Sequence, residues 1–546
     1  MDDYLIQRKQ LIADDRALRI DHTAQRKIPD EEHQADKILG HIRSSEAESV
    51  WSATQPMKQL HGSQQLFPGM EFLTARETIV GTKLFDILSK MPKGGLLHAH
   101  HAAMVRVDVL LRLALSQPAV HIRVPAVLSL ATIGTVLPEF RGLPRAEWTT
   151  HPSITDQRYA PDTWVPIQNA RSNFSHALSG PEGFDRWFTN TMTINPSEAY
   201  GTHNTTGEIW KKFQSTFIAA QGLIFFEPIS TEYIRELFDA SIEDGISYVE
   251  IRMAFHQKYM TGADGERNVP HRVWLQLYDR VLEEVKADMK QQGREDEFVG
   301  SRIIYSILRI ITPEEIEWYL EDCIAMKQEF PHLISGFDLV GHEDTLLPLI
   351  YYAEPLLRFV ERQKELGIEI PFMFHAGETL GDGTVADMNL YDAILLGTKR
   401  IGHGFSLIKH PKLMQICREK DICVEERNTG MAPFGSLYIM RVQSLAQRLT
   451  GSMPMHPLPA VMNQGVHVAL CSDDPAVFGN MGLTFDFYQV FVASEVKSLA
   501  TLHELVWDSI RYSALDCEEK ESAFGKLERR WNIFVRYILD TYGAEG

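Results

Sequence analysis

The sequence has little cysteine and a marked shortage of basic residues. Its 546 residues include 5 cysteines, and 54 Lys and Arg stand against 73 Asp and Glu, which gives a formal net charge of −19. This excess of acidic groups argues against a nucleic-acid backbone or an anionic membrane surface as a partner, because both favour clustered Lys and Arg. We therefore expect neither nucleic acid nor membrane among the partners of this chain.

Long hydrophobic runs are also missing. The longest mostly apolar stretch, Val124 to Leu137, contains Pro125 and Gly134 and falls well short of the ~20 residues of a membrane span. The first 21 residues are charged and amphipathic, unlike a secretory signal peptide. The cysteines form no CxxC pair, which suits a reducing compartment with buried thiols. Two glycosylation tripeptides, at Asn173 and Asn204, point the other way, but such tripeptides often arise by chance. We expect a cytoplasmic location.

Eight short apolar, β-branched runs follow one another from Gly94 onward, and helical patterns separate most of them. The runs are Gly95–His100, Ser247–Met253, Arg302–Ile307, Gly336–Gly341, Phe372–Glu378, Arg400–Gly404, Asp421–Glu426 and Val466–Asp474. Eightfold alternation of helices with strands that are apolar on both faces predicts an α/β fold, a (β/α)₈ TIM barrel. A doubly wound open sheet would need fewer strands, and it usually carries a GxGxxG turn that this sequence lacks.

Three further segments surround the barrel, which we assign to residues 91–515. Residues 1–90 carry helical patterns over Tyr4–Ile20 and Glu71–Leu88 and predict a helical extension that either pairs two subunits or clasps the barrel. The first crossover, about residues 102–246, is too long for one helix and predicts an insertion after strand 1. Its helices are expected near Ser172–Phe188, Gly207–Ala219 and Glu232–Asp244. Residues 516–546 predict a C-terminal helix that packs on the barrel.

Two histidines at the end of the first run are the first candidates for chemistry. His98 and His100 are two residues apart on a strand, so both imidazoles project from the same face. Inside a barrel that face is the lumen, where paired imidazoles suit a metal ion. Taken alone, the pair fits two buried core histidines equally well.

Later strands also end in polar side chains. His375 and Glu378 close the fifth run, His403 closes the sixth, and Asp473 and Asp474 close the eighth. Barrel enzymes gather their catalytic groups at this end of the strands, and a purely structural sheet has no use for such a cluster. We interpret His98, His100, His375 and Asp473 as one mononuclear metal site. Nitrogen and oxygen ligands suit Zn²⁺, with Fe²⁺, Co²⁺ or Mn²⁺ as alternatives, and we expect Cys471 to pack instead of binding the metal.

Five motifs carry a resemblance to a known family. They occur in the order MPKGGLLHAH, GFDLVGHED, FHAGE, RIGHGF and CSDDPAVFG. The sequence resembles the adenosine deaminases, most closely the adenosine deaminase-related growth factor branch, over most of residues 85–535. The resemblance implies the barrel fold. It also implies one zinc ion per subunit and hydrolytic conversion of adenosine or 2′-deoxyadenosine to inosine-type products and ammonia.

The resemblance also implies individual roles for residues of this chain. His98, His100, His375 and Asp473 would bind zinc. Glu378 would protonate purine N1, and His403 would orient and deprotonate the attacking water. Asp474 would bond N7, the Gly341 N–H would meet N3, and Trp210 would line the pocket. The chemistry supports these roles, because zinc lowers the pKa of water to ~7 and a placed acid or base contributes ~10²–10⁴-fold.

The sequence departs from the family around the presumed ribose. His101 stands where an Asp usually follows HxH, Ile307 and Leu308 replace an Asp-His pair, and Glu425 to Asn428 replace a Cys-Pro stretch. His101 and Arg427, with Arg309, would move the pocket rim towards positive charge. We therefore hypothesise that 5′-phosphorylated adenosines (AMP, ADP or ATP) are accepted. The alternative is that His101 bonds the 5′-hydroxyl while Arg427 pairs with Glu425 or Glu426, and adenosine remains our leading substrate.

Two other functions remain open at this stage. A catalytically silent growth-factor-like binding protein would have lost metal and proton-transfer residues, whereas all seven are present. A different amidohydrolase, acting on another aminopurine or on nucleotides, fits the motifs as well, because specificity lies in loops that have diverged.

Overall fold

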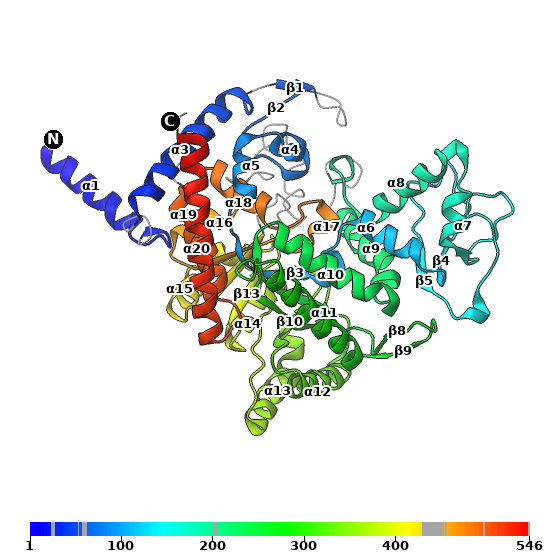
Figure 1. Ribbon diagram of the computed structural model, residues 1–546. Coiled ribbons are helices and arrows are strands. Elements are labelled where there is room, and N and C mark those ends of the chain that lie inside the picture. The colour runs from blue at the N-terminus through cyan, green and yellow to red at the C-terminus, as the bar shows by residue number, and fades with distance from the viewer. Residues whose placement is uncertain are drawn as a thin grey trace.

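The computed structural model describes residues 1–22, 28–52, 54–56, 63–199, 206–427, 453, 456–494 and 497–543, with backbone alone at 54–56, 63–65, 206, 207 and 427. Its centre is a set of parallel strands wrapped by helices (Figure 1). The strands in chain order are β3 (Gly94–His100), β7 (Ile246–Ala254), β10 (Gly300–Leu308), β11 (Ile334–Val340), β12 (His375–Ala376), β13 (Arg400–His403), β14 (Cys423–Arg427) and β15 (Val468–Cys471). Each of the eight strands overlaps one of the eight predicted runs, so the predicted strands are confirmed.

Two short bridges close these strands into a barrel. One sheet has the order β11-β10-β7-β3 and the other the order β12-β13-β14-β15, all in parallel. Phe337 pairs with Phe372 between the sheets on one side, and Ala99 pairs with Asp473 on the other. Hydrogen bonds from the His100 N–H to the Asp473 carbonyl (2.9 Å) and from the Asp473 N–H to the His98 carbonyl (3.1 Å) make this second closure. The barrel is therefore sealed by the residues that the sequence singles out as metal ligands.

Two strands, β12 and β15, are shorter than predicted by several residues. β12 has two residues because Gly377, at φ +79°, turns the chain directly after Ala376. β15 stops at Cys471, and Asp473 then adopts φ +58°. Both runs leave regular sheet pairing where their polar side chains begin.

Helices follow the strands around the outside of the barrel. They are α11 (His271–Gln291) after the β8–β9 hairpin (Tyr259–Thr261 and Arg267–Pro270), α12 (Pro313–Glu329), η5 (Leu349–Tyr352) with α13 (Ala353–Leu366), α14 (Asn389–Leu395), η6 (Phe405–Lys409) with α15 (Pro411–Glu419), α16 (Leu458–Asn463), and α17 (Pro475–Phe478) with α18 (Thr484–Val492) and α19 (Leu499–Arg511). α12 shows why such helices begin where they do, since Thr312 and Glu315 form a reciprocal capping box ahead of Pro313.

The insertion between β3 and β7 forms a separate lobe at one side of the barrel (Figure 1). Its elements are η1 (His101–Ala103), α6 (Val107–Ser116), β4 (Val120–Arg123), β5 (Glu139–Gly142), η2 (Arg145–Glu147), β6 (Val165–Pro166), α7 (Ile167–Ser172), η3 (His176–Leu178), α8 (Gly180–Met192), α9 (Thr206–Ile224) and α10 (Glu227–Glu243). The helix expected near Ser172–Phe188 corresponds to α8, which begins only at Gly180, after Ser179 adopts positive φ. The antiparallel sheet β5-β4-β6 was not foreseen from the sequence.

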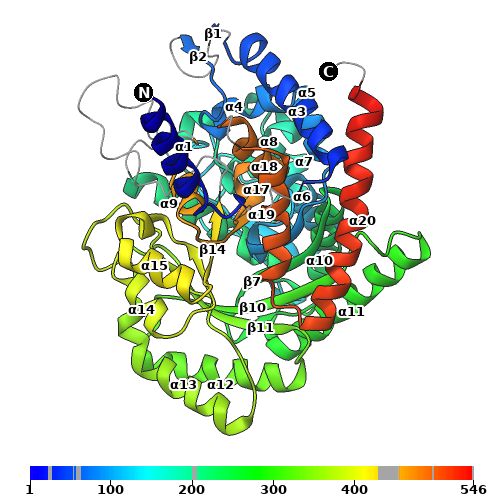
Figure 2. The same ribbon diagram turned by 90° about the vertical axis from the view of Figure 1, so that its left-hand side faces the viewer.

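The N-terminal helix α3 (Asp30–Ser49) and the C-terminal helix α20 (Cys517–Tyr542) lie side by side (Figures 1 and 2). The N-terminal region contains α1 (Asp2–Arg16), α3, the short strands β1 (Thr54–Pro56) and β2 (Ser63–Gln65), α4 (Phe72–Ile79) and α5 (Lys83–Ser89). The expected single helix over Glu71–Leu88 is divided, because Thr82 caps a new helix by accepting the Phe85 N–H. The C-terminal α20 runs beside α3, and the Trp531 indole donates to Glu32.

Four of the five cysteines fit the expectation of buried thiols. Cys323, Cys417, Cys423 and Cys471 are buried free thiols, whereas Cys517 is exposed at the start of α20. A search of the described helices finds none with the length and apolar character needed to cross a bilayer. The cytoplasmic location stays a prediction.

Helix α1 projects from the body of the molecule (Figures 1 and 2) and has no buried residue. Tyr4 and Leu11, which lie seven residues apart on one face, are 63% and 71% exposed. Exposed apolar side chains on a helix that buries none of its residues in the described part of the chain fit the predicted pairing of two subunits.

We predict that Tyr4→Asp combined with Leu11→Asp converts a dimer into a monomer, because charges placed on the paired face would be desolvated. Light scattering at micromolar concentration measures this. The matched control is Leu130→Asp, a change at a 78% exposed leucine of the insertion, which should stay dimeric. An unmodified chain that is already monomeric would contradict the prediction.

Candidate active site

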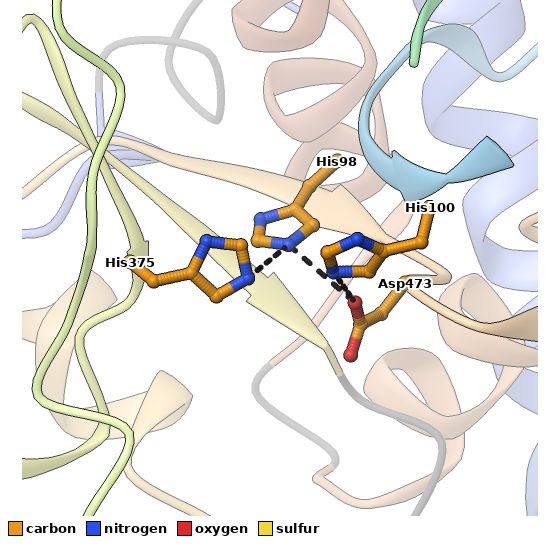
Figure 3. A group of neighbouring side chains, drawn as sticks. All are labelled: His98, His100, His375 and Asp473. Atoms are coloured by element: carbon orange, nitrogen blue, oxygen red, sulfur yellow. Dashed lines mark hydrogen bonds and ion pairs between the residues drawn. The ribbon is translucent and has the colours of Figure 1, made fainter. Parts of the chain in front are cut away.

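Four predicted ligands meet at the carboxyl ends of the strands (Figure 3). One ligand atom each from His98, His100, His375 and Asp473 lies within 4.8 Å of the others. The His98 Nε2 is 3.1 Å from the His375 Nε2 and 3.4 Å from the Asp473 Oδ1, and the His100 Nε2 is 3.2 Å from the same oxygen. The structure thus brings together all four residues that the sequence assigned to one metal site.

The hydrogen-bond partners of two of these histidine rings suit a cation bound between the rings. The His98 Nδ1 lies 3.0 Å from Glu425, and the His375 Nδ1 lies 2.7 Å from Asp338. A carboxylate only accepts hydrogen bonds, so a neutral ring at either position keeps its proton on Nδ1 and presents a lone pair at Nε2. Two lone pairs 3.1 Å apart cannot bond each other, whereas a divalent cation between them would satisfy both.

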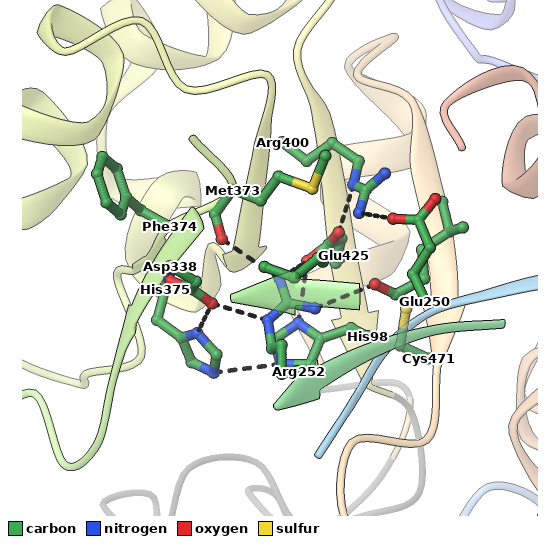
Figure 4. A network of polar contacts seen from close by, with 12 residues as sticks. His98, Glu250, Arg252, Asp338, Met373, Phe374, His375, Arg400, Glu425 and Cys471 are labelled. Atoms are coloured by element: carbon green, nitrogen blue, oxygen red, sulfur yellow. Dashed lines mark hydrogen bonds and ion pairs between the residues drawn. The ribbon is translucent and has the colours of Figure 1, made fainter. Parts of the chain in front are cut away.

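A buried network of charges fixes these two rings from behind (Figure 4). Arg252 donates to Asp338 (2.8 Å) and to Glu425. Arg400 donates to Glu425 and to Glu250. Burial alone would raise the pKa of Glu425, but Arg252 and Arg400 outweigh it and hold that pKa well below its usual range. The pKa of Asp338 is likewise lowered against the effect of burial, by His375 and Arg252. Both carboxylates therefore stay ionised beneath the ligands.

Sequence reasoning did not assign this network to the site. Its five members lie in predicted strands, at Glu250, Arg252, Asp338, Arg400 and Glu425, and all are at most 1% exposed. A charged residue in the middle of a strand buried on both faces is rare unless it is paired, and this is the signal that could have revealed them. Outer carboxylates of this kind orient metal-binding histidines and raise their basicity.

Left-handed backbone places two further site residues. His403 and Asp473 have φ of +67° and +58°, a conformation that costs a non-glycine residue on the order of 1–3 kcal/mol. The Gly-His-Gly frame around His403 has a steric reason as well, since a Cβ on Gly402 would lie 2.9 Å from the His98 ring. Such strain is common at functional sites, where it aims a side chain.

The proposed proton-transfer residues stand beside the cluster. The Glu378 Oε2 is 3.9 Å from the His403 Nε2, and the His403 ring centroid lies 4.8 Å from that of His98. Asp474 is buried and precedes α17. Burial lowers the pKa of His100, but Asp474 and Asp473 outweigh it and raise that pKa. The structure places all three residues where the sequence reasoning expects them.

A cavity of about 410 Å³ opens over the cluster, within the size range of small-molecule sites. Trp210 of α9 and Gly341 both line it. Trp210 stacks on His342 with the ring centroids 4.1 Å apart. Gly341 has φ of +115°, and a Cβ there would lie 2.6 Å from Leu346, so this position holds glycine for want of room.

The expected positive rim is not confirmed. His101 is 1% exposed and packs on the rings of Tyr233 and Trp274, and burial lowers its pKa to about 3. It is therefore a neutral wall residue of the cavity rather than a cation. Arg309 is fully buried and donates to Glu343 and to the Leu339 and His375 carbonyls, so the expectation that it helps to bind phosphate is wrong.

Arg427 ends β14, and its side chain lies outside the described residues. Glu425 is already paired with Arg252 and Arg400. Cys471 packs as expected, with its Sγ 3.5 Å from the Ala469 carbonyl and a pKa raised by burial.

Comparisons with known proteins agree with this geometry. The family described as adenosine deaminase matches residues 194–529. The chain is 31% identical to adenosine deaminase 2-A of Danio rerio over 91% of this chain and 90% of that protein. It is 32% identical to adenosine deaminase 2 of Sus scrofa over 86% and 84%.

Solved structures share the fold at low identity. An amidohydrolase from Burkholderia ambifaria with bound Zn is 15% identical, covers 84% of this chain and 95% of its own, and has a TM-score of 0.50. The arabidopsis protein ADAL complexed with IMP is also 15% identical, with 82% and 99% coverage and a TM-score of 0.51. The family match, the relatives and the histidine–carboxylate cluster together show that this chain belongs to the adenosine deaminase family and is a hydrolytic deaminase that acts on small molecules.

Proposed function

We propose that this chain is a zinc-dependent deaminase of adenosine and 2′-deoxyadenosine, and that it releases inosine-type products and ammonia. The observation that carries the proposal is the pair of Nε2 atoms, of His98 and His375, that face each other with Asp473 and His100 beside them. A nitrogen-rich set with one carboxylate and no thiolate is typical of a catalytic zinc site. The amidohydrolase of the same fold that was solved with bound Zn supports this choice of metal.

The residues of the site fit hydrolysis at purine C6. When bound, zinc supplies hydroxide at neutral pH by lowering the pKa of water to ~7. His403 lies beside the ligands and takes the proton of the attacking water. Glu378 lies next to His403 and gives a proton to N1, which accepts charge as water adds to C6. Asp474 and the Gly341 N–H hold N7 and N3, and Trp210 forms a wall of the pocket.

Removing one ligand tests the metal assignment. His100→Ala should lose both stoichiometric metal and deaminase activity, because it removes one of the three imidazole ligands and weakens the hold on the ion. Elemental analysis together with the ultraviolet change of adenosine measures both. Full metal content in this variant would show that the ligand set is wrong.

Changing the proton donor should separate chemistry from metal binding. Glu378→Gln should lower kcat by ~10² or more while zinc is retained, because it removes a proton and leaves every ligand in place. Steady-state kinetics on metal-loaded protein is the measurement. A kcat close to that of the unmodified enzyme would contradict the role of Glu378.

The buried network should control metal affinity. Glu425→Gln replaces the charged acceptor of the His98 Nδ1 proton by a neutral amide and should weaken zinc binding roughly 10–100-fold. The neighbouring Glu426 is a matched control, since it is similarly buried but its partner is His456 instead of a histidine of the cluster. Glu426→Gln should leave zinc affinity unchanged in competition with a chelator. Equal affinities of the two variants would contradict the role of Glu425.

A further inference from the structure

The wall of the cavity across from the proton-transfer residues is apolar. Glu378, His403 and Asp474 follow β12, β13 and β15, whereas β7 and β10 lie on the opposite arc of the strand ring. The lining side chains on that arc include Met253, Leu308 and Ile310. These positions hold no carboxylate or amide that could bind a sugar hydroxyl.

Helix α9 extends the apolar wall. Trp210, Phe213 and Phe217 line the cavity at steps of three and four residues, so they share one face of the helix over ~10 Å. Phe225, just after the end of α9, continues this wall. Phe213 stacks on Phe478, and Phe225 meets the His256 ring at 5.5 Å. The glutamines Gln214 and Gln221 are the polar exceptions on this helix.

The chemistry of the purine decides which part of a substrate meets this wall. In the proposed function, C6 lies at the metal cluster and N1 lies at Glu378. The bond from N9 to the sugar leaves the bicyclic ring on the side away from C6 and N1. The sugar and its 5′ substituent are therefore directed towards the ends of β3, β7 and β10 and towards α9.

One polar group on that side is suited to a neutral sugar. The Nδ1 and Nε2 of His101 are buried without a hydrogen-bond partner in the described part of the chain. Its ring is held between Tyr233 and Trp274, and it lines the cavity. A ribose hydroxyl both donates and accepts, so it can satisfy such an imidazole, and leaving the ring nitrogens unpaired is costly.

The same side offers little to a phosphate. Among the described lining residues the arginine is Arg252, which is already bound to Asp338 and Glu425. A separate cavity of about 460 Å³ contains Arg123, Arg141 and Arg267. Ile218, Gln221 and Phe225 line both cavities and stand between them. The arginines of the second cavity can therefore contact only a substrate group that is long enough to extend past these side chains. A phosphate dianion held against the apolar wall would lose its hydration without compensation.

We propose that the site accepts adenosines with an uncharged, apolar 5′ substituent, such as 5′-methylthioadenosine, and discriminates against a 5′-phosphate. The inference rests on the proposed function. The reaction consumes one water and releases ammonia from C6, so 5′-methylthioadenosine gives 5′-methylthioinosine and the thioether is unchanged.

The test compares kcat/KM for adenosine, 5′-methylthioadenosine, AMP and ATP on the zinc-loaded full chain. We expect 5′-methylthioadenosine to lie within about tenfold of adenosine, and AMP at least about 100-fold below it. AMP or ATP used as well as adenosine would overturn the proposal, as would a loss of more than about 100-fold for 5′-methylthioadenosine. No turnover of any of the four compounds would instead refute the proposed function itself.

A substitution at the edge of the cavity tests whether the apolar wall determines the preference for an apolar 5′ substituent. Ile310 lines the cavity yet is 60% exposed, so Ile310→Asp should fold normally. It should lower the ratio of kcat/KM for 5′-methylthioadenosine over adenosine at least about tenfold, because a carboxylate disfavours the thioether. The matched control is Ile533→Asp, at a 68% exposed isoleucine of α20, which should leave that ratio unchanged. Equal ratios in the two variants would overturn the assignment of the wall.

Discussion

The close approach of two histidine nitrogens is the constraint on which the site depends. His98 and His375 come from opposite strands of the ring, and their Nε2 atoms are 3.1 Å apart with lone pairs facing each other. Buried partners hold this arrangement, since Glu425 and Asp338 accept the Nδ1 protons of the two rings. Their charges are in turn held by Arg252 and Arg400. The buried charges in the core of the barrel thus orient the histidine rings of the metal site.

The barrel and the site are also linked through the backbone. The bridge between Ala99 and Asp473 closes β3 onto β15, and Asp473 is at the same time a ligand with left-handed φ. The strain at this residue is supported by two hydrogen bonds to β3. Metal binding and closure of the strand ring should therefore stabilise each other, as expected where a metal couples to folding.

The barrel and the positions of the candidate ligands, Glu378, His403 and Asp474 could be predicted from the sequence, because strand alternation and polar strand ends are local patterns. The role of Glu425 could not, since its partners Arg252, Arg400 and His98 come from three other strands. The same limit explains the error at Arg309: its position after a strand suggests the pocket, but the fold turns it inward to Glu343. The place of His101 likewise could not be predicted, because it depends on packing against the rings of Tyr233 and Trp274.

Anomalous X-ray diffraction at the zinc edge, from crystals of the zinc-loaded chain, tests the central claim most directly. We expect one strong peak about 2.0–2.2 Å from the ligand atoms of His98, His100, His375 and Asp473. A second histidine–carboxylate group, His467, Glu504 and Asp508, also brings its ligand atoms together, but Arg511 already pairs with both of its carboxylates. A peak at that second group alone, or no peak at the barrel cluster, would contradict the assignment of the active site.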